Sequence, residues 1–163
     1  MKLLFLFLTL IACQTSHSDL AHSEMTTYAK KASKEKGLVL EGMGGAMMGD
    51  IQELEMIFVS AHHSSLAEAR KLMVSTIEEF LIQINSNPQI RPHLHTYPMT
   101  AHNLSLSISF RDSQNNYPPP EYIALTFIAN GNIVYARRVN DRFCDHYKEP
   151  IEEAFALVKA ETL

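Results

Sequence analysis

The segment Leu104–Phe110 alternates apolar residues with serines over its whole length. Successive side chains of a β-strand point to opposite faces of a sheet, so the alternation predicts a strand with one buried and one solvated face. A sheet with one apolar face is stable only when another layer covers that face. We therefore expect the helices of this chain to pack on one side of a sheet.

Four more segments have the composition and length of strands. They are residues 38–41, 53–60, 122–129 and 132–138. The dipeptide Asn130-Gly131 separates the last two segments and is well suited to the positive φ angles of a type I′ turn, so we expect a hairpin there. Residues 111–121 include three consecutive prolines and predict a loop before this hairpin.

Three segments have the periodicity of amphipathic helices. They are residues 23–37, 64–86 and 150 onward. Gly37 is suited to end the first helix, Ser64 or Ser65 to begin the second, and Pro150 to begin the third. Residues 88–103 are expected to form an ordered connection. The order α-β-β-α-β-β-β-α predicts an α+β fold of two layers, with a mainly antiparallel, five-stranded sheet and helices on one face.

The chain begins with Met1-Lys2, followed by a run of ten mainly apolar residues. A helix needs about 20 apolar residues to cross a bilayer, so this run is too short to span one and is typical of a secretory signal peptide. It leads into residues 10–13, Leu-Ile-Ala-Cys, which resemble the lipobox of bacterial lipoproteins. The resemblance implies cleavage before Cys13, acylation of Cys13 with fatty acids such as palmitate, and anchorage to the bilayer of a bacterial cell envelope.

Gln14 follows the cysteine. An Asp at this place would resemble an inner-membrane retention signal, so in a diderm bacterium the resemblance implies the outer membrane. The alternatives are an ordinary signal sequence that happens to end in a cysteine, and a buried N-terminal helix. On the lipoprotein interpretation the chain divides into a signal peptide (1–12), a flexible polar tether (13–23) and a single α+β domain (24–163).

The formal net charge of the chain is −4 at pH 7. This charge gives no overall attraction to phosphate backbones, so we expect no nucleic-acid partner. One local group of positive charge lies on the polar face of the first predicted helix and comprises Lys30, Lys31, Lys34 and Lys36. This face could contact anionic lipid head groups, but a solvated helix face is the favoured interpretation.

Residues 42–50 contain four glycines directly after a predicted strand. A glycine-rich loop in this position can cradle a phosphate, but both common nucleotide motifs need a helix to follow it. A strand is expected here instead. The segment therefore predicts a flexible or bulged hairpin connection.

Eight histidines are present, which raises the question of a metal site. The candidates are His62, His63, His93, His95, His102 and His146. His93 and His95 would point the same way, as two metal ligands must, if their segment were extended. No histidine, carboxylate or thiol motif with metal-ligand spacing accompanies them, so we expect ordinary histidines, no metal and no cofactor.

Cys144 is the only thiol left once Cys13 carries lipid. His146 is two residues away, but the partners of catalytic Cys–His pairs are normally brought together by the fold. Phe143 and Tyr147 offer apolar cover. We therefore expect Cys144 to be largely buried and inert, in a loop before the last helix.

Arginines and tyrosines near the expected hairpin and in the proline-rich loops form a candidate ligand or partner surface. Such side chains recognise carboxylates, phosphates and sugars, and stiff loops lose little entropy on binding. The candidate residues are Tyr97, Tyr117, Tyr122, Arg137, Arg138 and Arg142. The alternative is that they only stiffen connections and end a hairpin.

The sequence as a whole predicts a membrane-anchored lipoprotein of a bacterial envelope. Its domain is expected to be a non-catalytic interaction or ligand-binding module with a protein or small-molecule partner. The alternative is a metal-dependent or thiol enzyme of the envelope. A deep pocket with convergent polar groups would favour the enzyme, whereas a shallow surface with aromatic loops would favour the binding module.

Overall fold

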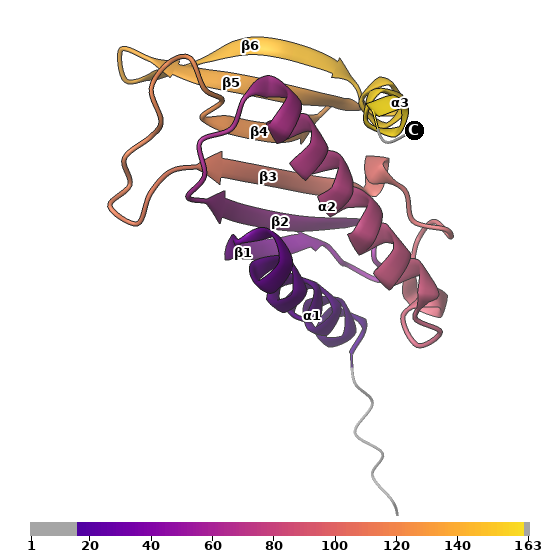
Figure 1. Ribbon diagram of the computed structural model, residues 1–163. Helices are drawn as coiled ribbons and strands as arrows, with labels where there is room; N and C mark the ends of the chain where they lie inside the picture. The colour runs from indigo at the N-terminus through magenta and orange to yellow at the C-terminus, as the bar shows by residue number, and fades with distance from the viewer. Residues whose placement is uncertain (1–15, 162–163) are drawn as a thin grey trace, which may run out of the picture.

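The computed structural model describes residues 16–161. In this part of the chain the structure has three α-helices, two short 3-10 helices and one six-stranded sheet (Figure 1). The elements in chain order are α1 (His17–Lys36), β1 (Leu38–Ala46), β2 (Glu53–Ser60), α2 (Leu66–Ser86), η1 (Arg91–His93), η2 (Ala101–Asn103), β3 (Leu104–Phe110), β4 (Leu125–Ala129), β5 (Asn132–Val139), β6 (Arg142–Pro150) and α3 (Ile151–Glu161).

The six strands lie side by side in the order in which they occur along the chain. Neighbouring strands are antiparallel except β2 and β3, which are parallel because α2 carries the chain back between them. Helices α1 and α2 cross one face of the sheet, and α3 follows β6 and packs beside α2 (Figure 1). The α+β class is confirmed, but the sheet has six strands instead of the expected five.

The additional strand is β6, in a segment that we expected to be a loop. Its residues are exposed except Glu149, so it has no alternation of apolar and polar residues from which a strand could be inferred. Asn140 and Asp141 have φ angles of 49° and 60° and form a second tight turn between β5 and β6. Charged and polar residues are typical of a strand at the edge of a sheet, which must not pair with other chains.

The first helix begins earlier than predicted. Ser16 caps α1 by accepting a hydrogen bond from the Asp19 amide at 3.1 Å, and Ala21 is fully buried. The predicted tether of residues 13–23 is therefore wrong for residues 17–23, while residues 13–15 lie outside the described residues. The N-terminal polar stretch is helical because its capping box supplies partners for the first amides of the helix.

Other local predictions are confirmed. Gly37 ends α1 with a φ angle of 67°, and Ser65 caps α2, which ends at Ser86. Asn130 and Gly131 both have positive φ angles, 49° and 73°, in the turn between β4 and β5. In each case a short sequence signal coincides with a local backbone requirement.

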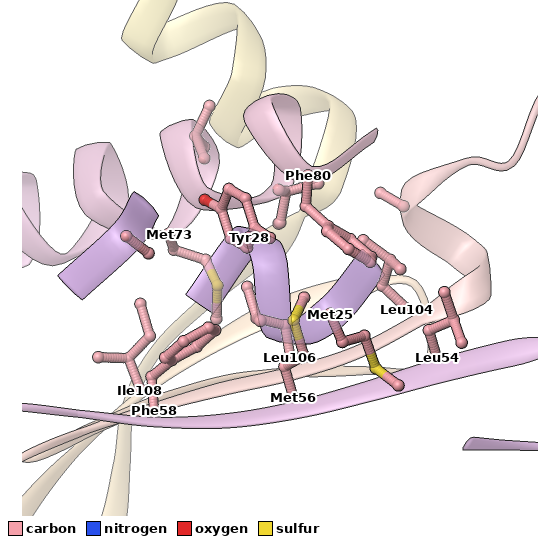
Figure 2. Packing of buried hydrophobic residues seen from close by; sticks show 14 of the residues in the cluster. Met25, Tyr28, Leu54, Met56, Phe58, Met73, Phe80, Leu104, Leu106 and Ile108 are labelled. Carbon is pink, nitrogen blue, oxygen red and sulfur yellow. The ribbon is translucent and has the colours of Figure 1, made fainter. Parts of the chain in front are cut away.

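The apolar core lies between the two long helices and the centre of the sheet (Figure 2). Tyr28 of α1 packs against Phe80 of α2, with ring centres 5.3 Å apart, and meets the edge of Phe58 of β2 at 6.5 Å. Leu106 and the other apolar residues of β3 are buried on this face, while the intervening serines are half-buried on the other face. The alternation in β3 therefore arises because one face of the strand is covered and the other is partly solvated, as predicted.

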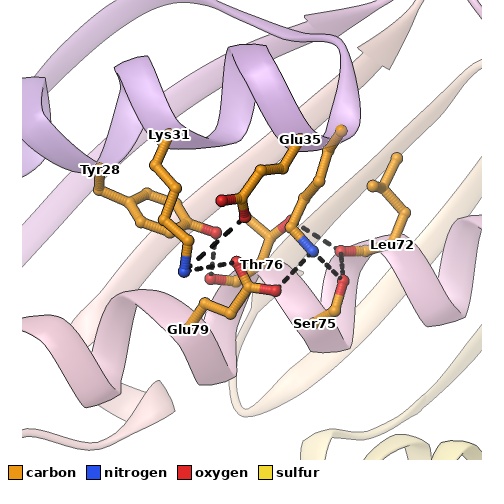
Figure 3. Close-up of polar contacts among 8 residues, drawn as sticks. Tyr28, Lys31, Glu35, Leu72, Ser75, Thr76 and Glu79 are labelled. Carbon is orange, nitrogen blue, oxygen red and sulfur yellow. Dashed lines mark hydrogen bonds and ion pairs between the residues drawn. The ribbon is translucent and has the colours of Figure 1, made fainter.

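A polar seam between α1 and α2 lies beside this core (Figure 3). The Tyr28 hydroxyl donates to the carbonyl of Thr76 at 3.0 Å, and burial raises the pKa of Tyr28. Glu79 of α2 pairs with Lys36 at 2.8 Å and with Lys31 at 3.5 Å. Two of the four lysines of the predicted basic face are therefore paired with a carboxylate of the same domain.

The glycine-rich segment forms the end of β1 and its turn into β2, as the hairpin interpretation predicted. A bulge lies between Leu40 and Gly42. Gly45 has a φ angle of 148°, and a Cβ atom there would lie 2.1 Å from the carbonyl oxygen of Glu53. The glycine is needed because two strands approach each other closely here.

We predict that Gly45→Ala lowers the free energy of unfolding by about 2 kcal/mol, because the methyl group would collide with backbone at a strained φ angle. Gly44→Ala is the matched control, since a Cβ atom there meets only the flexible end of Glu55, at 3.4 Å. Urea unfolding of both variants measures the difference. Equal stabilities of the two variants would contradict this account of the hairpin.

Candidate functional site

The loop between β3 and β4 meets the turn between β5 and β6 at one end of the sheet (Figure 1). Arg138 of β5 packs against two aromatic rings at this place. Its guanidinium carbon is 4.3 Å from the ring centre of Tyr117 and 5.9 Å from that of Phe143. The two rings meet edge to face at 5.3 Å. The contacts join the proline-rich loop to the β5–β6 hairpin.

A polar pocket of about 440 Å³ opens beside this stack. It is lined by Asn115, Asn116, Tyr117, Pro118, Arg138, Asn140 and Asp141. The pocket thus presents amide groups, a phenol and a guanidinium, all of which can form hydrogen bonds with a polar ligand. We call it the hairpin pocket.

Asp112 organises the loop side of the hairpin pocket. Its carboxylate accepts hydrogen bonds from the backbone amides of Gln114 and Asn116, at 2.8 and 2.9 Å, and from the side-chain amide of Asn116 at 2.9 Å. These bonds, led by that of the Asn116 side chain, hold the pKa of Asp112 below its usual value. The carboxylate thus holds Asn116 and the backbone at Gln114 in place.

The guanidinium of Arg138 retains hydrogen-bonding capacity. One of its terminal nitrogens lies 3.3 Å from Asp141, whose side chain is 94% exposed. Its Nε atom is buried and has no hydrogen-bond partner in the described part of the chain. A ligand with an acidic or carbonyl oxygen could reach only the terminal nitrogens of this guanidinium, since Nε is buried.

The structure brings together only some of the predicted surface residues. Tyr117 and Arg138 meet in the hairpin pocket, and Arg142 begins β6 directly after the turn. Arg137 points to the other face of β5, opposite Cys144 of β6. The remaining two tyrosines lie elsewhere. The ring of Tyr122 packs against His63 at 5.2 Å, and Tyr97 stacks on Arg91 at 4.5 Å in the segment between α2 and β3.

A buried charge cluster lies under α2 and was not predicted from the sequence. Arg70 donates two hydrogen bonds to the fully buried carboxylate of Glu149, at 2.7 and 3.1 Å. The Tyr135 hydroxyl donates to the same carboxylate at 2.7 Å, and burial raises the pKa of this tyrosine. These contacts join α2 to β5 and β6.

The histidines do not converge. His93 belongs to the 3-10 helix η1 and stacks on His17, so the extended geometry that would align it with His95 is absent. His95 lies 2.6 Å from Asp50, and this hydrogen bond lowers the pKa of the Asp50 carboxyl. Within residues 16–161 no three histidine, cysteine, aspartate or glutamate side chains are grouped as they would be around a metal ion.

The prediction for Cys144 is wrong, because its side chain is exposed. The expected apolar cover is missing because β6 is an edge strand and Phe143 packs against Tyr117. The sulfur lies 4.0 Å from the carbonyl oxygen of Arg142, a weak contact.

A second hollow, of about 730 Å³, is mainly apolar and lies between α2, residues 98–102 and α3. Its lining includes Ile82 and Phe155, and His102 and Glu152 pair across its rim at 3.0 Å. We call it the helix groove. It lies at the end of the sheet opposite the hairpin pocket (Figure 1).

Comparison of the chain with protein-family models, with curated proteins and with solved structures gives no match. Among the described residues, none of the helices combines the length and the apolar character that crossing a membrane requires.

We predict that Arg70→Met lowers the free energy of unfolding by about 3–5 kcal/mol, because it leaves the Glu149 carboxylate buried without its counter-charge. The double variant Arg70→Met, Glu149→Met should recover most of this loss, since it removes both charges. Chemical denaturation of both variants and the parent protein tests the pair. If the double variant were as unstable as the single one, the cluster would owe its effect to packing and not to charge.

Proposed function

We propose that this protein is a lipoprotein of the bacterial envelope, anchored through Cys13, whose domain binds a ligand in the hairpin pocket without catalysing a reaction. The proposal of a lipid anchor is supported by the Leu-Ile-Ala-Cys motif of residues 10–13, at the end of a short apolar run. Two or three acyl chains on one cysteine give stable anchorage, since each buried methylene contributes about 0.8 kcal/mol. In a diderm bacterium, Gln14 after the cysteine favours the outer membrane.

The chemistry of the hairpin pocket supports a particular ligand class. Arg138 suits a carboxylate, which accepts two hydrogen bonds from a guanidinium. The amides of Asn115, Asn116 and Asn140 suit hydroxyl groups, which both donate and accept. We therefore propose a small acidic sugar or a similar polyhydroxylated acid as the ligand.

The arrangement of the lining favours binding over reaction. Asp141 is the only acid among the lining residues, and it is almost fully exposed to water. A general acid or base works best when its environment tunes its pKa and holds it against the substrate. The stacked Arg138 and the asparagines are instead preorganised hydrogen-bonding groups, which suit recognition.

For the anchor, we predict that Cys13→Ala moves the full-length protein from the detergent phase to the aqueous phase in a phase-partitioning experiment and abolishes labelling with a radioactive fatty acid. Cys144→Ala is the matched control and should partition and label like the parent protein. A Cys13→Ala variant that still takes up fatty acid would contradict acylation at this cysteine.

For the hairpin pocket, we predict that glucuronate binds more tightly than glucose, and that Arg138→Lys weakens glucuronate binding by about tenfold because a lysine cannot form the two-pronged contact. Arg142→Lys is the control, since Arg142 is exposed nearby but does not line the pocket. Calorimetric titration measures both affinities. Equal binding of the acid and the neutral sugar, or no effect of Arg138→Lys, would remove support for this ligand class.

A further inference from the structure

The start of α1 limits how far the domain can lie from its anchor. Only Gln14 and Thr15 separate Cys13 from Ser16, the capping residue of α1. Three residues of fully extended chain span at most about 11 Å, whatever their conformation. If Cys13 is acylated, as we propose, the N-terminal end of α1 must therefore lie within about 11 Å of the lipid surface.

The end of α1 is tied to two neighbouring segments. The His17 ring bonds the carbonyl oxygen of Met47 at 2.7 Å, and it stacks on His93 of η1 at 6.1 Å. His93 in turn accepts a hydrogen bond from the Ile51 amide through its carbonyl. The turn between β1 and β2 and the segment after α2 are thus held at the same end of the molecule as the start of α1 (Figure 1). We call this end the anchor pole.

The anchor pole exposes side chains that are suited to a lipid interface. Met48, next to Met47, is 93% exposed, although a methionine side chain has no polar group to be hydrated. Tyr97 is 48% exposed and stacks on Arg91, and tyrosine and arginine are both favoured at membrane surfaces.

The helix groove opens beside Tyr97. The Tyr97 hydroxyl reaches the carbonyl of Asn85 at 3.5 Å, and Asn85 is one of the residues that line the groove. Ile82, one turn earlier on α2 and in the same lining, is 71% exposed. Exposed apolar side chains therefore lie both at the anchor pole, at Met48, and in the neighbouring groove, at Ile82.

We infer that the anchor pole rests on the bilayer, with Met48 inserted among the lipids and Tyr97 and Arg91 at the level of the head groups. This inference rests on the proposed acylation of Cys13 and adds an orientation to it. The partner is a lipid surface, because the chain between anchor and helix is too short for a protein of ordinary size to lie between them.

The lysines of α1 give the competing orientation, in which the helix lies along the membrane. Lys31 and Lys36 are paired with Glu79, which weakens their attraction to anionic lipids. Lys36 is also the last of the 20 residues of α1, about 30 Å from its beginning. Lys36 is therefore the farthest of the four lysines from Cys13 along the chain. The anchor pole is the better contact because the exposed Met48 lies there, beside the start of α1.

A fluorescent depth measurement tests the orientation. Mature, acylated protein with Cys144→Ser is reconstituted into vesicles of phosphatidylethanolamine and phosphatidylglycerol, and a polarity-sensitive dye is attached after Met48→Cys. The matched control is Val39→Cys, since Val39 is an exposed apolar residue at the start of β1, at the other end of the sheet. Lys34→Cys reports the competing orientation.

We expect the dye at position 48 to shift to the blue and to be quenched by nitroxide-labelled lipids, while the dyes at positions 39 and 34 keep their emission in water. Protein that floats with the vesicles but shows quenching at position 34 and not at 48 would overturn the orientation and leave the anchor intact. The same would follow if the protein floated and the dye at position 48 kept its emission in water. Protein that does not float with the vesicles would overturn the anchor itself, and the orientation with it.

Discussion

Tyr28 occupies the place where both long helices meet the sheet. Its ring packs against Phe80 of α2 and Phe58 of β2. Its hydroxyl donates a hydrogen bond to the Thr76 carbonyl, so one side chain combines apolar packing with a buried hydrogen bond. This contact fixes how α1 lies on the sheet. Because α1 begins at His17, the contact also sets which end of the sheet lies beside the start of that helix.

Much of the fold could be predicted where burial leaves a pattern in the sequence. The alternation in β3, the periodicity of α2 and the turn at Asn130-Gly131 all indicated their structures, because a covered face, a covered stripe and positive φ angles each demand particular residues. Strand β6 gave no such signal. An edge strand with both faces exposed is held by backbone hydrogen bonds to its neighbour. These bonds do not require particular side chains, so the sequence shows no strand pattern.

The site was harder to predict for a related reason. Tyr117 and Arg138 are separated by a loop, a strand and a turn, and their contact depends on the β4–β5–β6 meander, of which the last strand was not expected. Tyr97 resembled Tyr117 in its proline neighbour but stacks on Arg91 in the segment between α2 and β3. Cys144, which is exposed, and Glu149, which is buried, both belong to that unexpected strand. Neither environment could therefore be inferred from the sequence.

The parallel pairing of β2 with β3 has a consequence for how the chain folds. Leu54 lies beside Leu104, so β1, β2 and both long helices cannot complete their core until β3 has joined them. Contacts between residues this distant in sequence form slowly, whereas the successive hairpins from β3 to β6 are local. During synthesis from the N-terminus, the apolar faces of α1 and α2 stay exposed until β3 has been made, and in this interval the chain is most open to aggregation.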